Sequence, residues 1–429
     1  MRHIGHTIRE LRKQLKMTQE QLAAGICTRS YISQIEKGSV VPSVSLLDSL
    51  AARLLVTVDR LQAESSSEQF AAYLHRLVTD VEEQNWQRVE ETISFLSEKE
   101  PLETKDRAVL AWAKGNWLEN VLHDYQQAQS LYEESLHLSE HMDPVTYIRA
   151  CNSLGFLYGK FGNTTDPVQG YPYLQKAYEL CETHQVNGRI RIWVTINMGI
   201  FFFKIGNCVK AIEYLLESLQ LNDRFRTDFR MEYAYNCLAA AYSALKQYQE
   251  AKLFATRVIE VSSKRRIEHM LLAGCYGNLG MILRHMGEYC AALEAFEKAV
   301  GLAETHQLKV LPNVQVEMAV TLTFLHRTSE AKALLTTVIR DGSIFETVAE
   351  AKFILANLLM EEQEEDEAIR LLEDALHGLE AKRLVLYHLP QAYHLLGKLY
   401  KQKGEKEKAL ALLEKSSELL LEIYTEKRR

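Results

Sequence analysis

Apolar residues recur at helical spacing from the start of the chain. Ile4, Ile8, Leu11 and Leu15 are separated by three or four residues, which predicts one helix over 4–16. Four further short helices are predicted before residue 62, and they begin near Thr18, Thr28, Ser43 and Val58. The first two begin at threonines, whose side chains cap the free N–H groups of a helix start. Residues 1–62 are therefore expected to form a head of five helices.

The third predicted helix has one apolar and one polar face. Ile32 and Ile35 form the apolar face. The polar face suits DNA, because Arg can fork onto a guanine edge, Gln onto adenine and Ser onto bases or phosphates. We predict DNA-binding roles for Arg29, Ser30, Ser33, Gln34 and Lys37, and phosphate contacts for Gln19 and Tyr31. The alternative interpretation is a solvated helix face.

From about residue 67 onward the apolar pattern repeats itself. An alanine followed by an apolar residue four positions later occurs at Ala128 and at Ala211, and from Ala211 it recurs at intervals of 37 to 41 residues, at Ala251, Ala292, Ala331, Ala368 and Ala409. A Gly or Ala preceded by Leu or Met lies twelve residues before each alanine from Ala211 onward. Each period therefore predicts a pair of helices packed closely through small residues.

Two stretches interrupt this regularity. The segment 63–70 is predicted as a polar linker, because Ser65-x-x-Glu68 matches a capping box that would start a new helix. The insert NTTDPVQG (163–170) displaces the second helix of the pair that begins at Leu154-Gly155. An irregular first pair around 68–98 brings the expected number of pairs over 71–429 to about nine.

Composition and charge agree with two kinds of domain. Only 7 prolines and 20 glycines occur in 429 residues, which favours helices. Residues 1–62 contain nine Lys or Arg and five Asp or Glu, a net charge of +4, so the remainder carries −11 of the total of −7. A basic head on an acidic body can approach phosphate with one end only.

Other classes of protein receive little support. The seven cysteines are scattered and form no C-x-x-C pair, which indicates reduced, mostly buried thiols. We expect a cytoplasmic protein without a signal peptide or membrane partner, because the apolar run GIFFFKIG is too short to span a bilayer. No phosphate loop, catalytic triad or metal quartet is present, so we expect no enzyme, cofactor or metal.

These motifs resemble two known families. TQEQLA, SYISQIEKG and PSVSLLDSLA resemble the Xre/Cro–lambda-repressor helix-turn-helix family over about residues 4–61. The resemblance implies that Thr28 to Gln34 enter the major groove, that Gln19 clamps the DNA backbone, and that two heads bind paired half-sites. The repeats resemble tetratricopeptide repeats, best at 278–303 and 395–419. That implies an all-α fold, with a right-handed superhelix whose first helices line a groove.

In this register a set of asparagines falls on the groove-lining helices. A side-chain amide both donates and accepts, so a ladder of them suits the backbone of an extended peptide. We predict peptide binding by Asn116, Asn152, Asn197, Asn236, Asn278 and Asn357, with Arg149 for a carboxylate. Further charge and pocket walls are expected from Lys160, Lys204, Arg284 and Lys398, and from Phe203, Tyr235, Tyr276 and Phe353. The alternative is that these asparagines brace neighbouring helices.

The combination of head and repeats resembles the peptide-pheromone-responsive regulators of Gram-positive bacteria, the RRNPP family, and its NprR-like and PlcR-like members in particular. This resemblance implies a quorum-sensing transcription regulator, whose partners are operator DNA, a signalling oligopeptide and a second copy of the chain. One alternative is a Rap-like body that binds a response regulator, with candidate residues Gln84, Gln87, Gln126 and Gln127. Another is a repeat domain that senses a protein partner.

Overall fold

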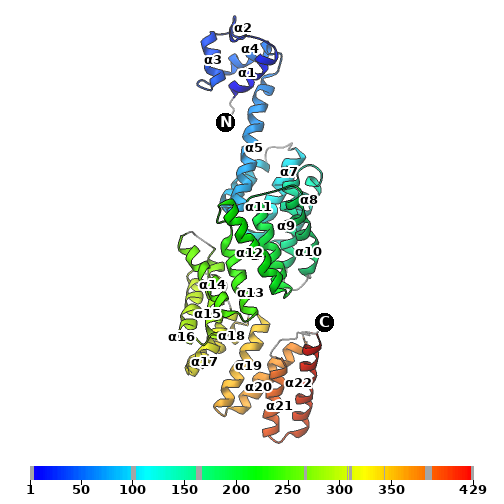
Figure 1. Cartoon of the computed structure of the whole chain (residues 1–429), viewed down its shortest axis with the longest axis vertical. Coiled ribbons are helices and arrows are strands. Elements are labelled where there is room, and N and C mark those ends of the chain that lie inside the picture. The colour runs from blue at the N-terminus through cyan, green and yellow to red at the C-terminus, as the bar shows by residue number, and fades with distance from the viewer. Residues whose placement is uncertain are drawn as a thin grey trace. The chain divides into compact units, whose positions relative to one another are not determined.

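The computed structural model describes residues 4–97, 103–160, 167–264, 268–306, 308, 312–342, 344–381 and 389–426. Every regular element within these ranges is a helix (Figure 1), as expected for an all-α chain. Two compact units are present, residues 1–197 and 198–429. The boundary falls inside one helix, α11 (Arg189–Lys204). The first unit holds the head and the early repeats, and the second holds the later repeats.

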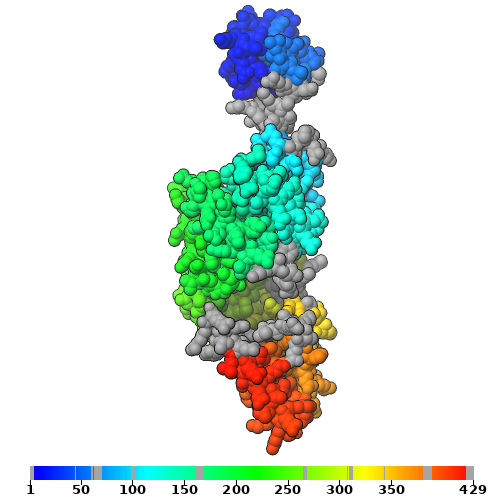
Figure 2. All heavy atoms as spheres, turned by 90° about the vertical axis from the view of Figure 1, so that its right-hand side faces the viewer, coloured from blue at the N-terminus to red at the C-terminus, as the bar shows by residue number. Residues whose placement is uncertain are grey.

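The head consists of four short helices and the start of a fifth, as predicted. Its helices are α1 (Ile4–Gln14), α2 (Gln19–Ala23), α3 (Arg29–Lys37), α4 (Val44–Arg53) and the first part of α5 (Val58–Glu82). In Figure 2 the atoms of the head form one compact cluster. Ile8, Leu22, Ile32, Ile35 and Leu50 are fully buried at its centre. The spacing of apolar residues thus placed the core of the head correctly.

Helix ends in the head follow the predicted capping chemistry. The hydroxyl of Thr18 accepts a hydrogen bond from the Gln21 backbone, and the Gln21 side chain accepts one from the Thr18 backbone. Thr28 caps α3 in the same way, accepting from the N–H of Tyr31 at 3.2 Å. Helix α3 ends at Gly38, whose φ of 76° is costly for a residue with a Cβ. The length and start of α3 are therefore set by Thr28 and Gly38.

The predicted linker 63–70 is not a break between helices. It lies inside α5, which runs without interruption from Val58 to Glu82, so the helix start expected at Ser65 is wrong. Leu61 packs in the core of the head, whereas Leu74, Leu77 and Val81 pack in the core of the first repeats. One helix thus belongs to both cores, because the polar stretch between them is still compatible with helical structure.

Antiparallel helix pairs follow the head, and the described residues contain nine of them, as predicted. The first pair joins α5 to α6 (Trp86–Ser97), and the second joins α7 (Thr104–Trp117) to α8 (Tyr125–Ser139) through a π-helical turn at Leu118–Leu122. The remaining helices are α9 (Pro144–Lys160), α10 (Tyr171–Thr183), α11, α12 (Cys208–Phe225), α13 (Met231–Ala244), α14 (Tyr248–Lys264), α15 (His269–His285), α16 (Tyr289–Thr305), α17 (Pro312–Phe324), α18 (Thr328–Asp341), α19 (Phe345–Glu361), α20 (Glu365–Ala381), α21 (Leu389–Gln402) and α22 (Lys406–Glu426).

The small residues of the repeat sit where two helices touch. The seven repeat alanines from Ala128 to Ala409 are at most 3% exposed. On the facing helices, an added Cβ at Gly280 would lie 2.6 Å from the Phe296 ring, and one at Gly199 would lie 2.6 Å from Leu215. At these two glycines the helices of a pair therefore approach so closely that an added methyl group would not fit unless the facing side chain shifted.

The insert near Leu154-Gly155 lies partly outside the described residues, at 161–166. A short 3-10 turn, Pro167–Gly170, follows it and brings Gly170 against Gly155. Helix α10 then begins at Tyr171 and buries Ala177 completely. The second helix of this pair is thus displaced along the chain, as predicted.

All seven cysteines are free thiols. Burial raises the pKa of Cys151, Cys181, Cys237 and Cys275 to about 12, which keeps these thiols protonated and unreactive at neutral pH. None of the described helices combines the length and the apolar composition that crossing a bilayer requires.

Candidate functional site

Helix α3 presents the predicted polar face to solvent. Arg29, Ser30, Gln34 and Lys37 are exposed, whereas Tyr31 and Ser33 are half-buried. Ile32 and Ile35, on the opposite face, are fully buried and fix the rotation of the helix. The exposed residues carry two cations and an amide on one surface, a set that can contact base edges and phosphates. Thr28 serves as the N-cap of the same helix.

Gln19 takes part in a bond network that the sequence analysis did not anticipate. Its amide nitrogen donates to a Glu36 carboxylate oxygen at 2.7 Å, and Arg12 Nε donates to the other oxygen at 2.6 Å. Arg12 also donates to the carbonyl of Met17 at 2.7 Å. Because these residues come from α1, α2 and α3, the network fixes α2 against α3. The contact of Gln19 with the DNA backbone stays a prediction.

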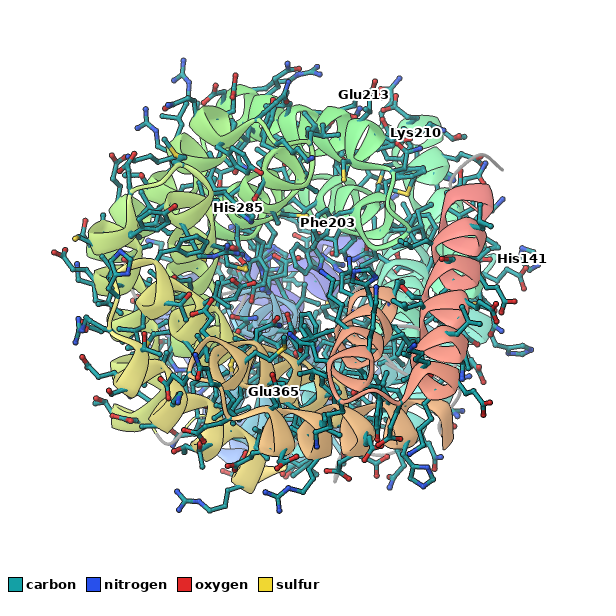
Figure 3. All side chains as sticks on the ribbon, turned by 90° about the horizontal axis from the view of Figure 1, so that it is seen from below. His141, Phe203, Lys210, Glu213, His285 and Glu365 are labelled. Carbon is teal, nitrogen blue, oxygen red and sulfur yellow. The ribbon has the colours of Figure 1, made fainter. Side chains whose placement is uncertain are left out.

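A cavity of about 600 Å³ lies in the second unit, against the inner side of three helices. Figure 3 shows Phe203 and His285 on this inner side, whereas Lys210 and Glu213 point outward. The walls come from the end of α11, one face along the length of α13 and the second half of α15. The lining residues are Ile200, Phe203, Lys204, Tyr233, Asn236, Cys237, Ala240, Ser243, Ala244, Asn278, Met281, Ile282 and His285.

Two of the predicted asparagines meet in this cavity. The Asn278 side-chain nitrogen donates to the Asn236 side-chain oxygen at 3.0 Å. Both side chains are half-buried, so neither is closed off by the core. An amide carries two donors and two acceptor sites, and this bond uses one donor of Asn278 and one acceptor site of Asn236. The pair is thereby oriented and retains hydrogen-bonding capacity.

A second asparagine pair lies in the first unit. The Asn197 side-chain nitrogen donates to the Asn152 side-chain oxygen at 3.0 Å, and the two residues are 1% and 3% exposed. Within the described residues, Asn197 Oδ1 has no hydrogen-bond partner. This pair braces α9 against α11, which is the alternative interpretation considered for these residues.

The other two asparagines bond to their own helices. Asn116 donates to the carbonyl of Trp112 at 2.9 Å, and Asn357 donates to that of Phe353 at 3.0 Å. The structure thus brings the predicted ladder together as two separate pairs and two single residues. Peptide binding by each of them stays a prediction.

Several of the predicted cations are engaged in ion pairs with the chain itself. Arg149 pairs with Glu82 at 3.1 Å, Lys160 with Glu119 at 2.8 Å, and Arg284 with Glu317 at 2.7 Å. Lys398 is exposed and Lys204 lines the cavity. These pairings could not be read from helix periodicity, because each partner is at least 33 residues away in the sequence.

Of the four aromatic residues predicted to wall a side-chain pocket, one lines the cavity and three make other contacts. Phe203 lines the cavity, whereas Tyr235 stacks against Phe254 with ring centroids 6.1 Å apart. Tyr276 lies under the ammonium group of Lys298 at 5.8 Å, and Phe353 packs on the core of the last repeats.

Sequence reasoning missed His285 and Tyr233 at the cavity. Burial lowers the pKa of His285, and the neighbouring Arg284 lowers it further. The His285 ring also stacks on Tyr248 with ring centroids 5.2 Å apart. A neutral imidazole can donate and accept at neutral pH. For His285 the signal was its place at the end of a first helix, whereas Tyr233 lies in the first turn of α13 and had no such signal.

The glutamines of the response-regulator alternative lie in three places, the turn after α5, helix α6 and helix α8. Gln126 and Gln127 belong to the first turn of α8, where Gln127 donates to the capping Asp124 at 2.6 Å. Gln84 lies in the turn after α5, with a φ of 59°, and Gln87 donates to Glu91 at 3.3 Å. No single arrangement of the four residues follows from these positions.

Sequence comparisons define the class of the protein in two parts. The helix-turn-helix family profile matches residues 8–61, and tetratricopeptide-repeat profiles match residues 230–305 and 390–419. Comparison with curated protein sequences finds no match. The chain thus contains a helix-turn-helix segment and, within its body, tetratricopeptide repeats.

The fold is shared with several solved structures, among them the quorum sensor NprR. The apo form of the quorum sensor NprR from B. thuringiensis covers 83% of this chain and 99% of its own, with 16% identity and a TM-score of 0.64. NprR in complex with its cognate peptide NprX covers 84% and 99%, with 16% identity and a TM-score of 0.56. The apo form of RapI covers 83% and 99%, with 11% identity and a TM-score of 0.61. At these identities the similarity shows the fold.

Proposed function

We propose that this chain is a cytoplasmic, non-enzymatic quorum-sensing transcription regulator, which binds operator DNA through α3 and is switched by a short peptide. The observation that carries the proposal is the Asn236–Asn278 pair in the cavity of the second unit. Two oriented amides beside apolar walls suit a peptide whose main chain is bound by hydrogen bonds and whose side chains enter a pocket. The NprR fold, which takes up the peptide NprX, supports the same use of the repeats.

The DNA-binding half of the proposal rests on α3. Its exposed face joins Arg29, Gln34 and Lys37, and its buried face is anchored by Ile32 and Ile35. A single head of this size makes few base contacts, so specific binding calls for two heads on paired half-sites. We propose that the repeats set this pairing by forming a homodimer or a higher oligomer.

We propose that the peptide switches the protein because it binds one state of the protein more tightly than the other. A peptide shifts the balance between two oligomeric or conformational states only as far as it binds one state more tightly than the other. The state favoured by the peptide then allows or prevents simultaneous binding of two half-sites.

Mass spectrometry of small molecules that co-purify with the full chain from its native host tests the peptide. We expect an oligopeptide that dissociates on denaturation and is absent from a variant with Asn236 and Asn278 both replaced by Ala. Co-purification of a folded protein instead would favour the response-regulator or protein-sensing alternative. A receiver-domain pull-down with and without the peptide separates these outcomes.

Removal of residues 1–62 tests the division into a DNA-binding domain (1–62) and a sensing domain (71–429). The cut falls within α5 and leaves Leu74, Leu77 and Val81, which pack with the first repeats. We expect a helical product that keeps the peptide and loses DNA binding. An aggregated product would contradict separate folding.

A further inference from the structure

The end of α5 is tied to repeats that are not its neighbours. Glu82 pairs with Arg149 of α9 at 3.1 Å and lies 3.9 Å from Arg189 of α11. Glu83 pairs with Arg189 at 3.1 Å. We call Glu82 and Glu83 the acidic corner, since they stand where α5 turns into α6.

These ion pairs join helix pairs that are not adjacent in the repeat array. Stacked repeats contact their nearest neighbours, yet the first helix pair here contacts the third through Arg149 and the fourth through Arg189. The residues joined are 67 and 106 positions apart in sequence. The acidic corner therefore bridges repeats that the stacking alone does not bring into contact.

Arg149 is held in place by more than its ion pair. Its guanidinium lies 5.5 Å from the centre of the Trp112 ring. That ring is fixed by a hydrogen bond from Trp112 Nε1 to the Ser153 hydroxyl at 3.1 Å. The Arg149 and Glu82 side chains are each 18% exposed. A partly desolvated arginine with a fixed orientation binds a carboxylate more strongly than a mobile surface cation does.

Arg149 also lies one helical turn before Asn152, on the same face of α9. A site built on Arg149 is thus placed on the side of the first helices where the asparagine pairs occur.

We propose that Arg149 and Arg189 form a carboxylate-binding site, which the acidic corner occupies in the unliganded protein and from which a ligand carboxylate displaces it. This inference rests on the proposed function, since the ligand is taken to be a peptide. The carboxylate is either its C-terminus or an acidic side chain. Displacement releases the end of α5, the helix that continues into the DNA-binding head.

The competition can be measured directly in the full chain. The probe is a fluorescent hexapeptide with the sequence of residues 80–85, DVEEQN, with a free or an amidated C-terminus. A tethered competitor acts at high effective concentration, so removing it frees the site. We expect the variant Glu82→Gln/Glu83→Gln to bind the probe about tenfold more tightly than the wild type, and we expect Arg149→Ala/Arg189→Ala in that background to abolish the gain.

A matched variant controls for net charge. Glu133→Gln/Glu134→Gln also removes two adjacent carboxylates from the first unit, and Glu134 forms an exposed ion pair with Arg107 at 3.4 Å. We expect this variant to bind the probe as the wild type does. A probe with NVQQQN and an amidated end carries no carboxylate and should bind none of the proteins. Loss of binding on amidation alone identifies the C-terminus as the group recognised, and loss only with the amidated NVQQQN probe identifies the side chains.

Equal affinity in the wild type and the acidic-corner variant would overturn the proposal, as would a gain that survives loss of both arginines or that the charge control reproduces. An absence of probe binding to every variant would overturn it too. Hydrogen exchange gives a readout that needs no ligand: the amides of residues 81–86 should exchange faster in the acidic-corner variant, and unchanged exchange would refute the release of α5.

The results that would contradict the proposed function differ from those that would contradict the carboxylate site. If no native peptide co-purifies but the hexapeptide competition behaves as expected, the carboxylate site stands and the peptide-sensing role does not. If a native peptide binds the wild type and the acidic-corner variant equally, the competition is refuted and peptide sensing stands.

Discussion

Asn278 donates a 3.0 Å hydrogen bond to Asn236 across two neighbouring first helices, α15 and α13, and both residues line the same cavity. The bond orients each amide toward a space wide enough for side chains of a ligand. Pre-orientation lowers the entropy that binding costs. Four experiments follow from this and other relationships in the structure.

Replacing Asn236 and Asn278 together with Ala should weaken binding of the co-purified peptide by tenfold or more, since each lost hydrogen bond contributes about 1 kcal/mol. Isothermal titration measures the effect. DNA binding without peptide should be unchanged. Asn187→Ala is the control, because the Asn187 amide donates to the backbone carbonyl of Gln185 and does not line the cavity. Equal losses in both variants would contradict a special role for the pair.

Replacing Arg29 or Gln34 with Ala should weaken specific operator binding while the head stays folded. A good base contact contributes about 1–3 kcal/mol, or roughly a 5- to 150-fold change in affinity. The operator is first selected from random duplexes with the wild type, and affinities are then compared by fluorescence anisotropy. Lys13→Ala removes the same charge from an exposed position outside α3 and should change affinity less. An unchanged operator affinity and DNA footprint in Arg29→Ala would contradict base recognition by α3.

Replacing Gly280 with Ala should destabilise the second unit by about 1–3 kcal/mol, because the new methyl group would overlap the Phe296 ring. Gly301→Ala gives the opposite expectation. No atom lies within 4 Å of a Cβ there, and Ala is favoured over Gly inside a helix by about 1 kcal/mol. Chemical denaturation of both variants provides the test. Similar stability changes in the two would show that close packing does not explain Gly280.

The pKa of His285 should lie below its usual value of 6.5. Burial lowers it most, Arg284 and Lys246 lower it further, and Glu317 partly offsets these effects. The unfolded chain then binds more protons than the folded one as pH falls through about 6.5, so this residue lowers stability on acidification and not at neutral pH. NMR titration gives the pKa. His285→Gln should flatten the stability profile between pH 7 and 5, and an unaltered profile would contradict the assignment.

Much of the architecture follows from local patterns. Thr18 and Thr28 begin helices because their hydroxyls can accept from backbone N–H groups two or three residues on. Ala211 or Gly280 marks a helix contact because only a small residue permits it. Such signals act over a few residues and recur at a fixed period, so they can be recognised without knowing what lies across the chain.

The predicted linker at 63–70 proved to be helical, and local patterns alone could not decide between a helix start and a helix interior. A capping box at Ser65 is compatible with a helix start and also with a helix interior. The choice depended on whether α5 was held at both ends, and Leu61 and Leu77 hold it in two different cores.

By itself the sequence determined the class of the protein: which segments are helical, where pairs of helices touch, and which face of α3 meets solvent. Only the tertiary structure decided which polar side chains face one another. Asn278 meets Asn236, and Arg149 meets Glu82, because stacking of successive repeats brings together residues 42 and 67 positions apart. Helical periodicity assigns a residue to a face of its own helix, whereas its partner depends on the pitch of the stack, which is a collective property of many packed side chains.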